Sequence, residues 1–282
     1  MMLRYGTYIV IAIFLSAFAA CNLEREIEID LPNYESKIFV ECYLEPGQPF
    51  TLLMTRTSPY FAPFPDLDLQ FLDELLVDSA EVLIKHKGIT YTLQNQLTIV
   101  NRTGKLYNYK ANELVPVDFD DDFELLITTK EGKTITGITR LLPKVPIDSI
   151  VVDFVENDTL ARVLTYFTDI PNQTNYYRRM LHEHTLDSIP QQDFATDDRF
   201  VEDLVVFGTG YDFTEGDTVF NTLVHIDLAY YDFYNSVQNA RVSNGNPFGQ
   251  PSPIASNLGG TAGALGIFTG LSYDRIMTII SR

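Results

Sequence analysis

The sequence predicts a mainly β protein with two consecutive antiparallel β-sandwich domains of immunoglobulin or fibronectin type, and one short helix in its C-terminal half. Three observations lead to this fold class. Short runs rich in β-branched and aromatic residues recur along the chain, and turn-forming residues separate them. The 282 residues are 45% hydrophobic, which is enough material for two buried cores.

The first predicted sandwich covers residues 37–142. Residues 38–44 and 50–57 have the composition of strands, and the turn formers of residues 45–49 stand between them. The clearest hairpin joins residues 123–129 to 134–140 through the turn Lys130-Glu131-Gly132-Lys133. Cys42, inside the first of these strands, is expected to be a small buried hydrophobic residue.

One segment, residues 58–77, does not fit a strand pattern. It contains three prolines, three phenylalanines, one tyrosine and four acids. One interpretation is a short helix over residues 67–76 that plugs one end of the sandwich, with Phe61, Phe64 and Phe71 in its core. The other is an aromatic loop that faces a partner protein.

The best domain boundary is Leu142-Pro143-Lys144-Val145-Pro146, because two prolines three residues apart disfavour both strand pairing and helix. The second domain is therefore predicted over residues 147–282. Residues 228–242 have the apolar spacing of a partly buried helix, residues 191–203 are predicted as a polar loop, and residues 266–280 close a sheet.

The first twenty residues are predicted to be a lipoprotein signal peptide. Residues 8–20 form a thirteen-residue apolar run, shorter than the roughly 20 residues that a membrane-spanning helix needs. The run ends in Phe18-Ala19-Ala20-Cys21, which resembles a bacterial lipobox, although Phe18 stands where leucine is usual. Cys21 would then carry palmitate or another acyl chain, and residues 21–36 would form an acidic tether. The alternative is an ordinary signal peptide followed by an incidental cysteine.

The residue pattern contains no catalytic signature. Neither G-x-S-x-G nor H-E-x-x-H occurs. His182-Glu183-His184 offers two candidate metal ligands on one strand face with no third in view, and we interpret the pair as part of an exposed strand face. The acidic residues 118–124 lack the glycine and the final glutamate of an EF-hand loop. We therefore expect no enzyme activity, no cofactor and no metal. A net charge of −18 makes nucleic acid an unlikely partner.

Four blocks of sequence carry a resemblance to a known family. They are residues 29–32 (IDLP), 40–47 (VECYLEPG), 134–139 (TITGIT), and the C-terminal set Asn246-Pro247-Phe248, residues 256–260 and Gly266-Ile267-Phe268. Together they resemble a family of Bacteroidota outer-membrane lipoproteins catalogued as domain of unknown function 4249. The resemblance covers nearly the whole mature chain and transfers no catalytic residue. The glycine-rich residues 257–270 are either tight turns that lead into a closing strand or a loop that a ligand approaches.

The resemblance implies a surface role beside outer-membrane TonB-dependent transporters. The leading hypothesis is accordingly a non-enzymatic lipoprotein, anchored in the outer membrane and facing outward, that binds a β-barrel partner. The contact residues that we select are aromatic, because buried aromatic side chains contribute much of the binding energy at interfaces: Tyr60, Phe61, Phe64, Phe71 and Phe248. The alternative is a free-standing surface module that binds a carbohydrate or a peptide.

Overall fold

The computed structural model describes residues 35–58, 69–100, 105–156, 158–199, 203–244 and 252–282. Residues 36–282 form one compact unit. The fold is mainly β with several antiparallel sheets, which confirms the predicted fold class. Within the described residues no helix is both long and apolar enough to cross a membrane.

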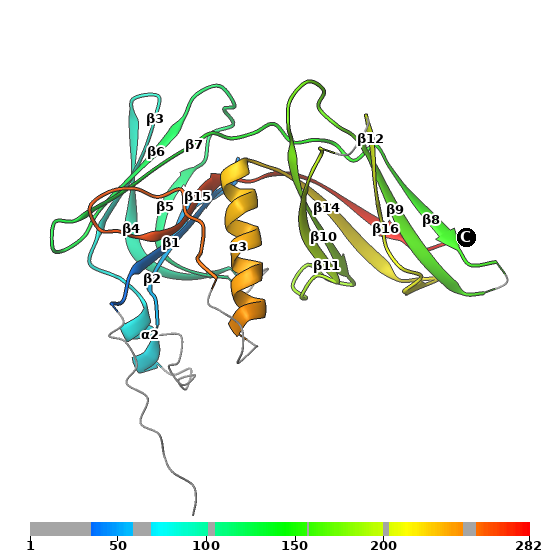
Figure 1. Cartoon of the computed structure of the whole chain (residues 1–282), viewed down its shortest axis with the longest axis horizontal. Coiled ribbons are helices and arrows are strands. Elements are labelled where there is room, and N and C mark those ends of the chain that lie inside the picture. Colours follow the sequence, from blue (N-terminus) through cyan, green and yellow to red (C-terminus); the bar gives the residue numbers. More distant parts are fainter. Residues whose placement is uncertain (1–34, 59–68, 101–104, 157, 200–202, 245–251) are drawn as a thin grey trace, which may run out of the picture. The chain divides into compact units, whose positions relative to one another are not determined.

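An eight-stranded sheet forms the N-terminal body (Figure 1). Its order is β15-β1-β2-β5-β4-β3-β6-β7. The β6–β7 hairpin is the one that the sequence predicts. The strands, in chain order, are β1 (Ile38–Leu44), β2 (Pro49–Arg56), β3 (Glu81–His86), β4 (Ile89–Val100), β5 (Lys105–Leu114), β6 (Phe123–Thr128), β7 (Thr134–Thr139) and β15 (Leu265–Gly270).

The sheet curls until its two outer strands approach each other. β15 pairs with β1 in parallel, the one parallel pairing among the described strands, and Gly259 bridges to Thr136 of β7. Gly266 has φ +127°, and a Cβ there would lie 1.9 Å from the carbonyl oxygen of Val40. Gly260, at φ +103°, meets the carbonyl of Thr134 in the same way. The glycine-rich segment therefore makes tight turns and a closing strand, and the chain's own backbone makes the close approach.

The core of this body is packed with apolar side chains that alternate along its strands. Val40, Cys42, Leu52 and Phe268 are fully buried in it. Cys42 is fully buried, which confirms the prediction of a small buried residue, and burial raises the pKa of its thiol well above its usual value.

Two four-stranded sheets form the C-terminal sandwich. One has the order β11-β10-β14-β16, and in the other β9 pairs with β8, β12 and β13. Phe167 and Tyr177 pack edge to face, with ring centroids 4.9 Å apart, inside this sandwich. The strands are β8 (Ser149–Phe154), β9 (Leu160–Thr168), β10 (Tyr176–Glu183), β11 (Gln192–Asp197), β12 (Leu204–Gly208), β13 (Phe213–Thr214), β14 (Thr218–Ile226) and β16 (Ser272–Ile279).

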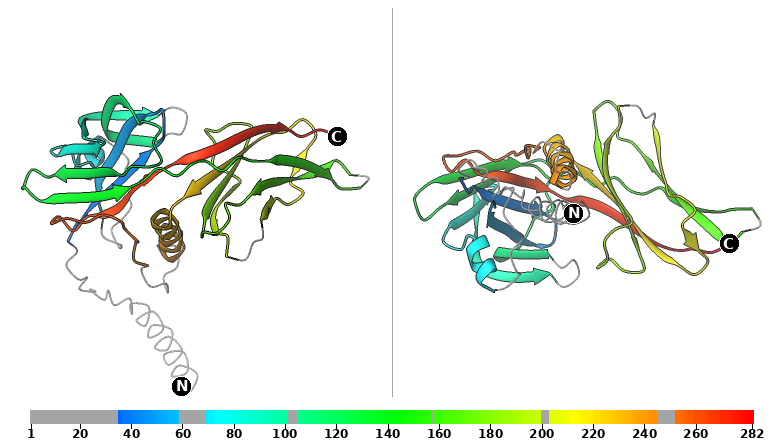
Figure 2. Two further views of the ribbon diagram at one scale, coloured as in Figure 1. Left: turned by 90° about the horizontal axis from the view of Figure 1, so that it is seen from above. Right: turned by 60° about the horizontal axis from the view of Figure 1, so that its bottom comes forward.

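One stretch of chain belongs to both sheet systems. β15 ends at Gly270 and β16 begins at Ser272, so that a nearly continuous extended segment passes from the eight-stranded sheet into the C-terminal sandwich (red in Figure 2). The predicted boundary at residues 142–147 stays a prediction, and the structure adds this second connection beside the proline segment.

Two helices complete the described chain. α2 (Leu69–Leu75) lies within the range 67–76 that one interpretation assigned to a short helix. α3 (Leu228–Asn244) matches the predicted residues 228–242 closely. Asp227 caps α3 by accepting a hydrogen bond of 2.7 Å from the backbone N–H of Tyr230. Burial raises the pKa of this Asp227 carboxyl.

α3 packs against both bodies, because its aromatic side chains reach in two directions. Phe233 lies 6.2 Å from Phe39 of β1, and Tyr230 lies 6.0 Å from Tyr43, between ring centroids. The same cluster includes Val224 of β14. α3 therefore joins the outer faces of the two sheet systems.

The prediction of a loop over residues 191–203 is wrong in part, because β11 occupies Gln192–Asp197. The segment has no apolar alternation, and backbone pairing with β10 holds it in the sheet. A two-pronged contact from Arg178 to Asp193 adds to this pairing, with both N–O distances 2.7 Å.

Candidate functional site

Most of the residues selected from the sequence lie outside the described part of the chain. These are Cys21, Tyr60, Phe61, Phe64 and Phe248. Phe71 is described: it lies on α2, where it is half-buried. Lipidation of Cys21 and partner binding through the aromatic residues therefore stay predictions.

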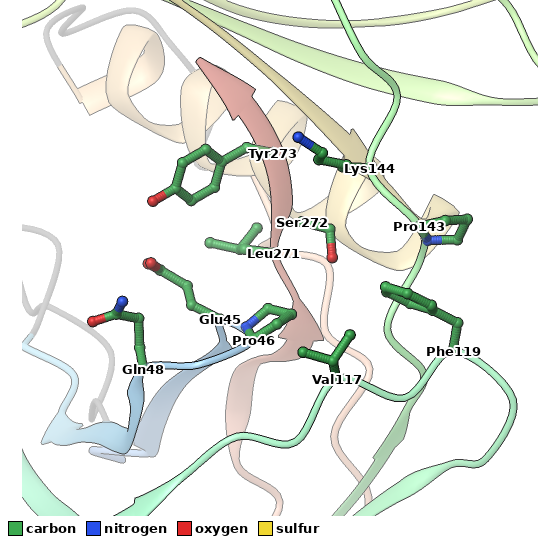
Figure 3. Close-up of a pocket in the computed structure, with 10 residues that line it drawn as sticks. All are labelled: Glu45, Pro46, Gln48, Val117, Phe119, Pro143, Lys144, Leu271, Ser272 and Tyr273. Atoms are coloured by element: carbon green, nitrogen blue, oxygen red, sulfur yellow. The ribbon is translucent and has the colours of Figure 1, made fainter.

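The described residues contain an apolar cavity of about 440 Å³ where the N-terminal body meets the C-terminal sandwich. Segments far apart in the sequence surround the crossing from β15 to β16 (Figure 3). Ser272 is buried there, and its Oγ has no hydrogen-bond partner within the described chain. The lining residues are Glu45, Pro46, Gln48, Val117, Phe119, Pro143, Lys144, Leu271, Ser272 and Tyr273.

A second cavity, of about 350 Å³, lies beside the first and is more polar. The two share Glu45, Leu271 and Tyr273, and we call them together the junction groove. Small-molecule sites typically occupy about 300–1,000 Å³, so each cavity is of that order. The second cavity is lined by Glu45, Lys105, Arg178, Met180, His182, Leu186, Asp187, Ser188, Ile189, Pro190, Asp193, Val224, Leu271, Tyr273 and Arg275.

Strand register explains why these side chains meet. Arg275 of β16 and Met180 of β10 both lie opposite Thr222 of β14, so all three share one face of the sheet. His182 is two residues further along β10 and points to the same face. The alternate residues, such as Arg179, point into the core of the sandwich, where Arg179 is 1% exposed.

Two of the three cations in the second cavity already have strong contacts. Arg178 is paired with Asp193 through two N–O contacts and donates a hydrogen bond to the hydroxyl of Tyr230. Lys105 lies over the ring of Tyr43, with Nζ 5.0 Å from the centroid. Burial, together with the charge of Arg178, lowers the pKa of Lys105.

The remaining cation is Arg275. Its Nε donates a hydrogen bond of 2.7 Å to Thr222 Oγ1, and its guanidinium lies 4.7 Å from the ring centroid of Tyr273. Arg275 forms no ion pair with any residue that the structure describes. Arg275 thus lines the cavity without an acidic partner among the described residues.

His182 is the unpartnered polar side chain of the second cavity. It is 8% exposed, and its Nδ1 has no hydrogen-bond partner among the described residues. Burial lowers the pKa of the imidazole, and the positive charge of Arg275 lowers it further. The ring is therefore neutral at neutral pH and can donate a hydrogen bond from one nitrogen.

The other histidines have different surroundings. The expectation that His182 and His184 share an exposed strand face is wrong, because His182 is buried and β10 ends at Glu183. His184 has φ +61°, which breaks the alternation. His86 stacks on Phe123, and His225 bonds to the carbonyl of Pro143 at 2.8 Å, so both have structural roles.

One group of described side chains has the composition of a metal site. Atoms of Glu183, His184 and Asp217 lie within 4.8 Å of one another. Both carboxylates already accept hydrogen bonds, one from Gln191 and the other from the backbone and side chain of Thr214. The group offers no further sign of an ion, and we assign no metal to it.

The acidic segment 118–124 is organised around a single carboxylate. Asp118 accepts hydrogen bonds from the backbone of Asp120 at 3.0 Å and from His86 Nε2 at 3.1 Å, and it pairs with Lys87. The Lys87 contact and these hydrogen bonds hold the pKa of Asp118 well below its usual value. The carboxylate is thus occupied by the chain itself.

Sequence reasoning missed Arg275 and Tyr273, because a charged residue in a closing strand has no distinctive signal. His182 was singled out, but as part of an exposed strand face that could at most contribute metal ligands. Together, the groove offers an unpaired cation, two buried polar atoms and apolar walls. This is the chemistry of a binding site for a small polar molecule with an apolar part.

Comparisons with known proteins give one family and no curated relative. The family model described as "Domain of unknown function (DUF4249)" matches residues 24–276. No curated protein matches. A solved structure titled "Cytokine receptor complex - Crystal form 1A" shares 10% sequence identity with this chain; the match covers 68% of this chain and 86% of that one, with a TM-score of 0.28. At this TM-score the likeness carries no argument.

Proposed function

The chain belongs to the family described as "Domain of unknown function (DUF4249)", and we propose that it is a non-enzymatic lipoprotein of the bacterial outer membrane. In this proposal it faces outward and acts as an accessory subunit of a TonB-dependent transporter or another β-barrel complex. The family resemblance implies a Bacteroidota source. Acyl chains on Cys21 would hold it on the membrane.

One observation carries this proposal: the apolar run of residues 8–20 stops at Ala19-Ala20-Cys21. Acyl chains contribute about 0.8 kcal/mol for each buried CH₂ group, so several chains on one cysteine anchor a protein firmly. The acidic residues 22–34 that follow are also consistent with a tether that anionic headgroups repel.

Partner binding is proposed for the aromatic segment that precedes α2. Tyr60, Phe61 and Phe64 stand together in a stretch rich in proline. Phe71 and Phe248 complete the proposed contact set. Buried aromatic side chains supply a large part of the energy of many protein interfaces, and proline reduces the entropy that an ordered loop loses.

Affinity purification from native membranes tests the partner proposal. We expect the tagged chain to recover a β-barrel protein, and deletion of residues 60–71 to abolish that recovery. A variant with Tyr60, Phe61 and Phe64 changed to alanine keeps α2 and should give the same loss. Unchanged recovery by both variants would refute the contact assignment, and recovery of no barrel by the unaltered chain would refute the partner.

The junction groove favours a second function, a surface module that binds a carbohydrate or a peptide directly. Its two cavities meet along Tyr273, an aromatic side chain on which a ligand can stack, and its buried polar atoms have no partner within the described chain. Direct binding of a carbohydrate or peptide by the purified chain, with no other protein present, would support this function. Binding only in the presence of a barrel would contradict it.

A further inference from the structure

We propose that the junction groove binds a small carboxylate that carries an apolar group. The carboxylate lies between Arg275 and His182, and the apolar group enters the apolar cavity on the other side of Tyr273. This inference deepens the second function above and rests on it. It is independent of lipidation and of any β-barrel partner.

The first argument is the charge of Arg275. Its Nε bonds to Thr222, and its guanidinium stacks on Tyr273, so the side chain is fixed from two directions. A fixed guanidinium that has no ion-pair partner among the described residues is suited to a carboxylate, because the planar fork matches the two oxygens.

The second argument is the buried nitrogen of His182. A buried polar atom without a hydrogen bond destabilises the fold by about 1–3 kcal/mol, so it is normally paired. His182 lines the same cavity as Arg275, its Nδ1 has no hydrogen-bond partner within the described chain, and the charge of Arg275 acts on its ring. A carboxylate held by Arg275 would give the imidazole an acceptor once the ring turns a nitrogen toward the cavity.

The third argument selects the remainder of the ligand. Beyond Tyr273 the lining becomes apolar, with Pro46, Val117, Phe119 and Leu271. Val117 is 69% exposed and Phe119 is 38% exposed, so apolar surface remains accessible at this end. Among the buried side-chain atoms of this lining, Ser272 Oγ is the one without a hydrogen-bond partner within the described chain. The lining fits an apolar group better than a polyhydroxylated sugar.

The charges around His182 set the pH dependence of binding. They come from four strands and two loops: Arg275 on β16, Arg178 on β10, Asp193 on β11, Lys105 on β5, Glu45 after β1 and Asp187 after β10. Arg178 and Asp193 neutralise each other, and Lys105 lies near Glu41 and Glu45. A bound carboxylate would raise the pKa of His182, so binding takes up protons. The affinity should therefore increase as the pH falls from 8 to 6.

Calorimetric titration of the purified full chain in detergent tests the proposal. The probes are N-acetyl-leucyl-leucine, the same peptide with an amidated C-terminus, hexanoate and glucuronate, each with a detergent blank. We expect N-acetyl-leucyl-leucine or hexanoate to bind, and the amide and glucuronate to bind at least about tenfold more weakly. Preference for the peptide assigns a peptide C-terminus as the source of the carboxylate, and preference for hexanoate assigns a fatty acid. Equal binding of acid and amide, or no binding of either acid, would overturn the proposal.

Three variants locate the site. Arg275→Gln should weaken binding by about tenfold or more, whereas Arg241→Gln, the same change at an exposed arginine of α3, should leave it unchanged. His182→Leu should weaken binding and remove its pH dependence between pH 8 and 6. Thermal unfolding of each variant verifies the fold. An unaltered affinity in Arg275→Gln would contradict the proposal.

These outcomes are separable from those of the anchoring proposal. If the Cys21→Ser chain leaves the membrane fraction and still binds the carboxylate with unchanged affinity, the groove assignment stands. A chain that remains acylated and recovers a barrel but binds no carboxylate would refute the groove assignment alone.

Discussion

The two bodies bury polar side chains in contrasting ways. In the N-terminal body, Asn108 of β5 is 2% exposed, and its amide makes three hydrogen bonds, to the backbone N–H and carbonyl of Met54 and to the carbonyl of Val77. In the C-terminal sandwich, Arg179 is 1% exposed, and its Nε has no partner within the described chain. The nearby Asn221 Nδ2 also has none among the described residues.

The two bodies therefore differ in how completely their buried polar side chains are hydrogen bonded. The N-terminal sheet closes on itself, and the amide of its buried Asn108 bonds to three backbone groups, although Thr139 Oγ1 on β7 has no partner within the described chain. The C-terminal sandwich holds a cation among neutral acceptors, Thr165 Oγ1 at 3.3 Å and Asn221 Oδ1 at 3.1 Å, and burial lowers the pKa of Arg179 to about 10. Buried charge of this kind is costly, so the C-terminal sandwich should be the less optimised body.

A substitution that disturbs the pairing of β15 with β1 should cause the largest loss in the free energy of unfolding. Gly266→Ala places a Cβ 1.9 Å from the carbonyl oxygen of Val40, which requires β15 to leave β1. We expect the free energy of unfolding to fall by more than about 4 kcal/mol, measured by chemical denaturation. Gly47→Ala is the control, because Gly47 also has a positive φ, +77°, but open space around it. That control should lose only about 1 kcal/mol, and equal losses in the two variants would contradict the closure argument.

Asn108→Leu should destabilise the N-terminal body by about 3 kcal/mol. The substitution keeps the branched arrangement of heavy atoms, but it leaves the backbone groups of Met54 and Val77 buried without partners. Chemical denaturation measures the loss. A loss below about 1 kcal/mol would show that water reaches these groups and that the apparent difference between the two cores is not real.

Replacing the buried Arg179 of the C-terminal sandwich by an apolar residue should affect stability in the direction opposite to Asn108→Leu. Arg179→Met removes a buried charge and keeps an unbranched apolar stem, so we expect stability to be unchanged or to rise by about 1–2 kcal/mol. Arg179→Ala, which also leaves a cavity, should be less stable than Arg179→Met. If the free energy of unfolding of Arg179→Met, measured by chemical denaturation, is lower by about 3 kcal/mol or more, the contacts of the guanidinium offset the cost of its burial. The proposed difference between Arg179 and Asn108 would then be wrong.

The smallest effect concerns acid stability. Burial lowers the pKa of His225, against weaker opposing effects of the Pro143 carbonyl and Asp169. A histidine with a lowered pKa in the folded state binds protons more readily when unfolded. The stabilisation that neutral His225 contributes to the folded state is therefore present above the unfolded pKa of about 6.5. It is lost as the pH falls below that value. We expect His225→Gln to flatten the decrease in unfolding free energy between pH 7 and 5. An identical pH profile in the two chains would contradict this assignment.

The sequence was sufficient for elements whose signals are local. The β6–β7 hairpin has a turn with Gly132 at φ +77° between two β-rich runs, and α3 has a regular apolar spacing. The pairing of β15 with β1 was not predictable in this way. The paired residues, such as Val40 and Gly266, are more than 200 positions apart, and parallel pairing leaves no turn between them.

The junction groove was hidden for a related reason. Arg275, Thr222 and His182 come from three strands, and only their register brings them to one face. The sequence did select His182, but it could not show that His184 leaves the strand or that Arg275 has no acidic partner among the described residues. Of the selected aromatic residues, only Phe71 falls in the described chain, so the partner-contact set remains to be tested by experiment.

The anchoring claim is central, and mass spectrometry of the mature N-terminus tests it most directly. The protein isolated from membranes should begin at Cys21, and its N-terminal peptide should carry the mass of attached acyl chains. The Cys21→Ser chain should give no such peptide and should leave the membrane fraction. A mature protein that begins at another residue, or an unmodified Cys21 in membrane-bound protein, would contradict the account.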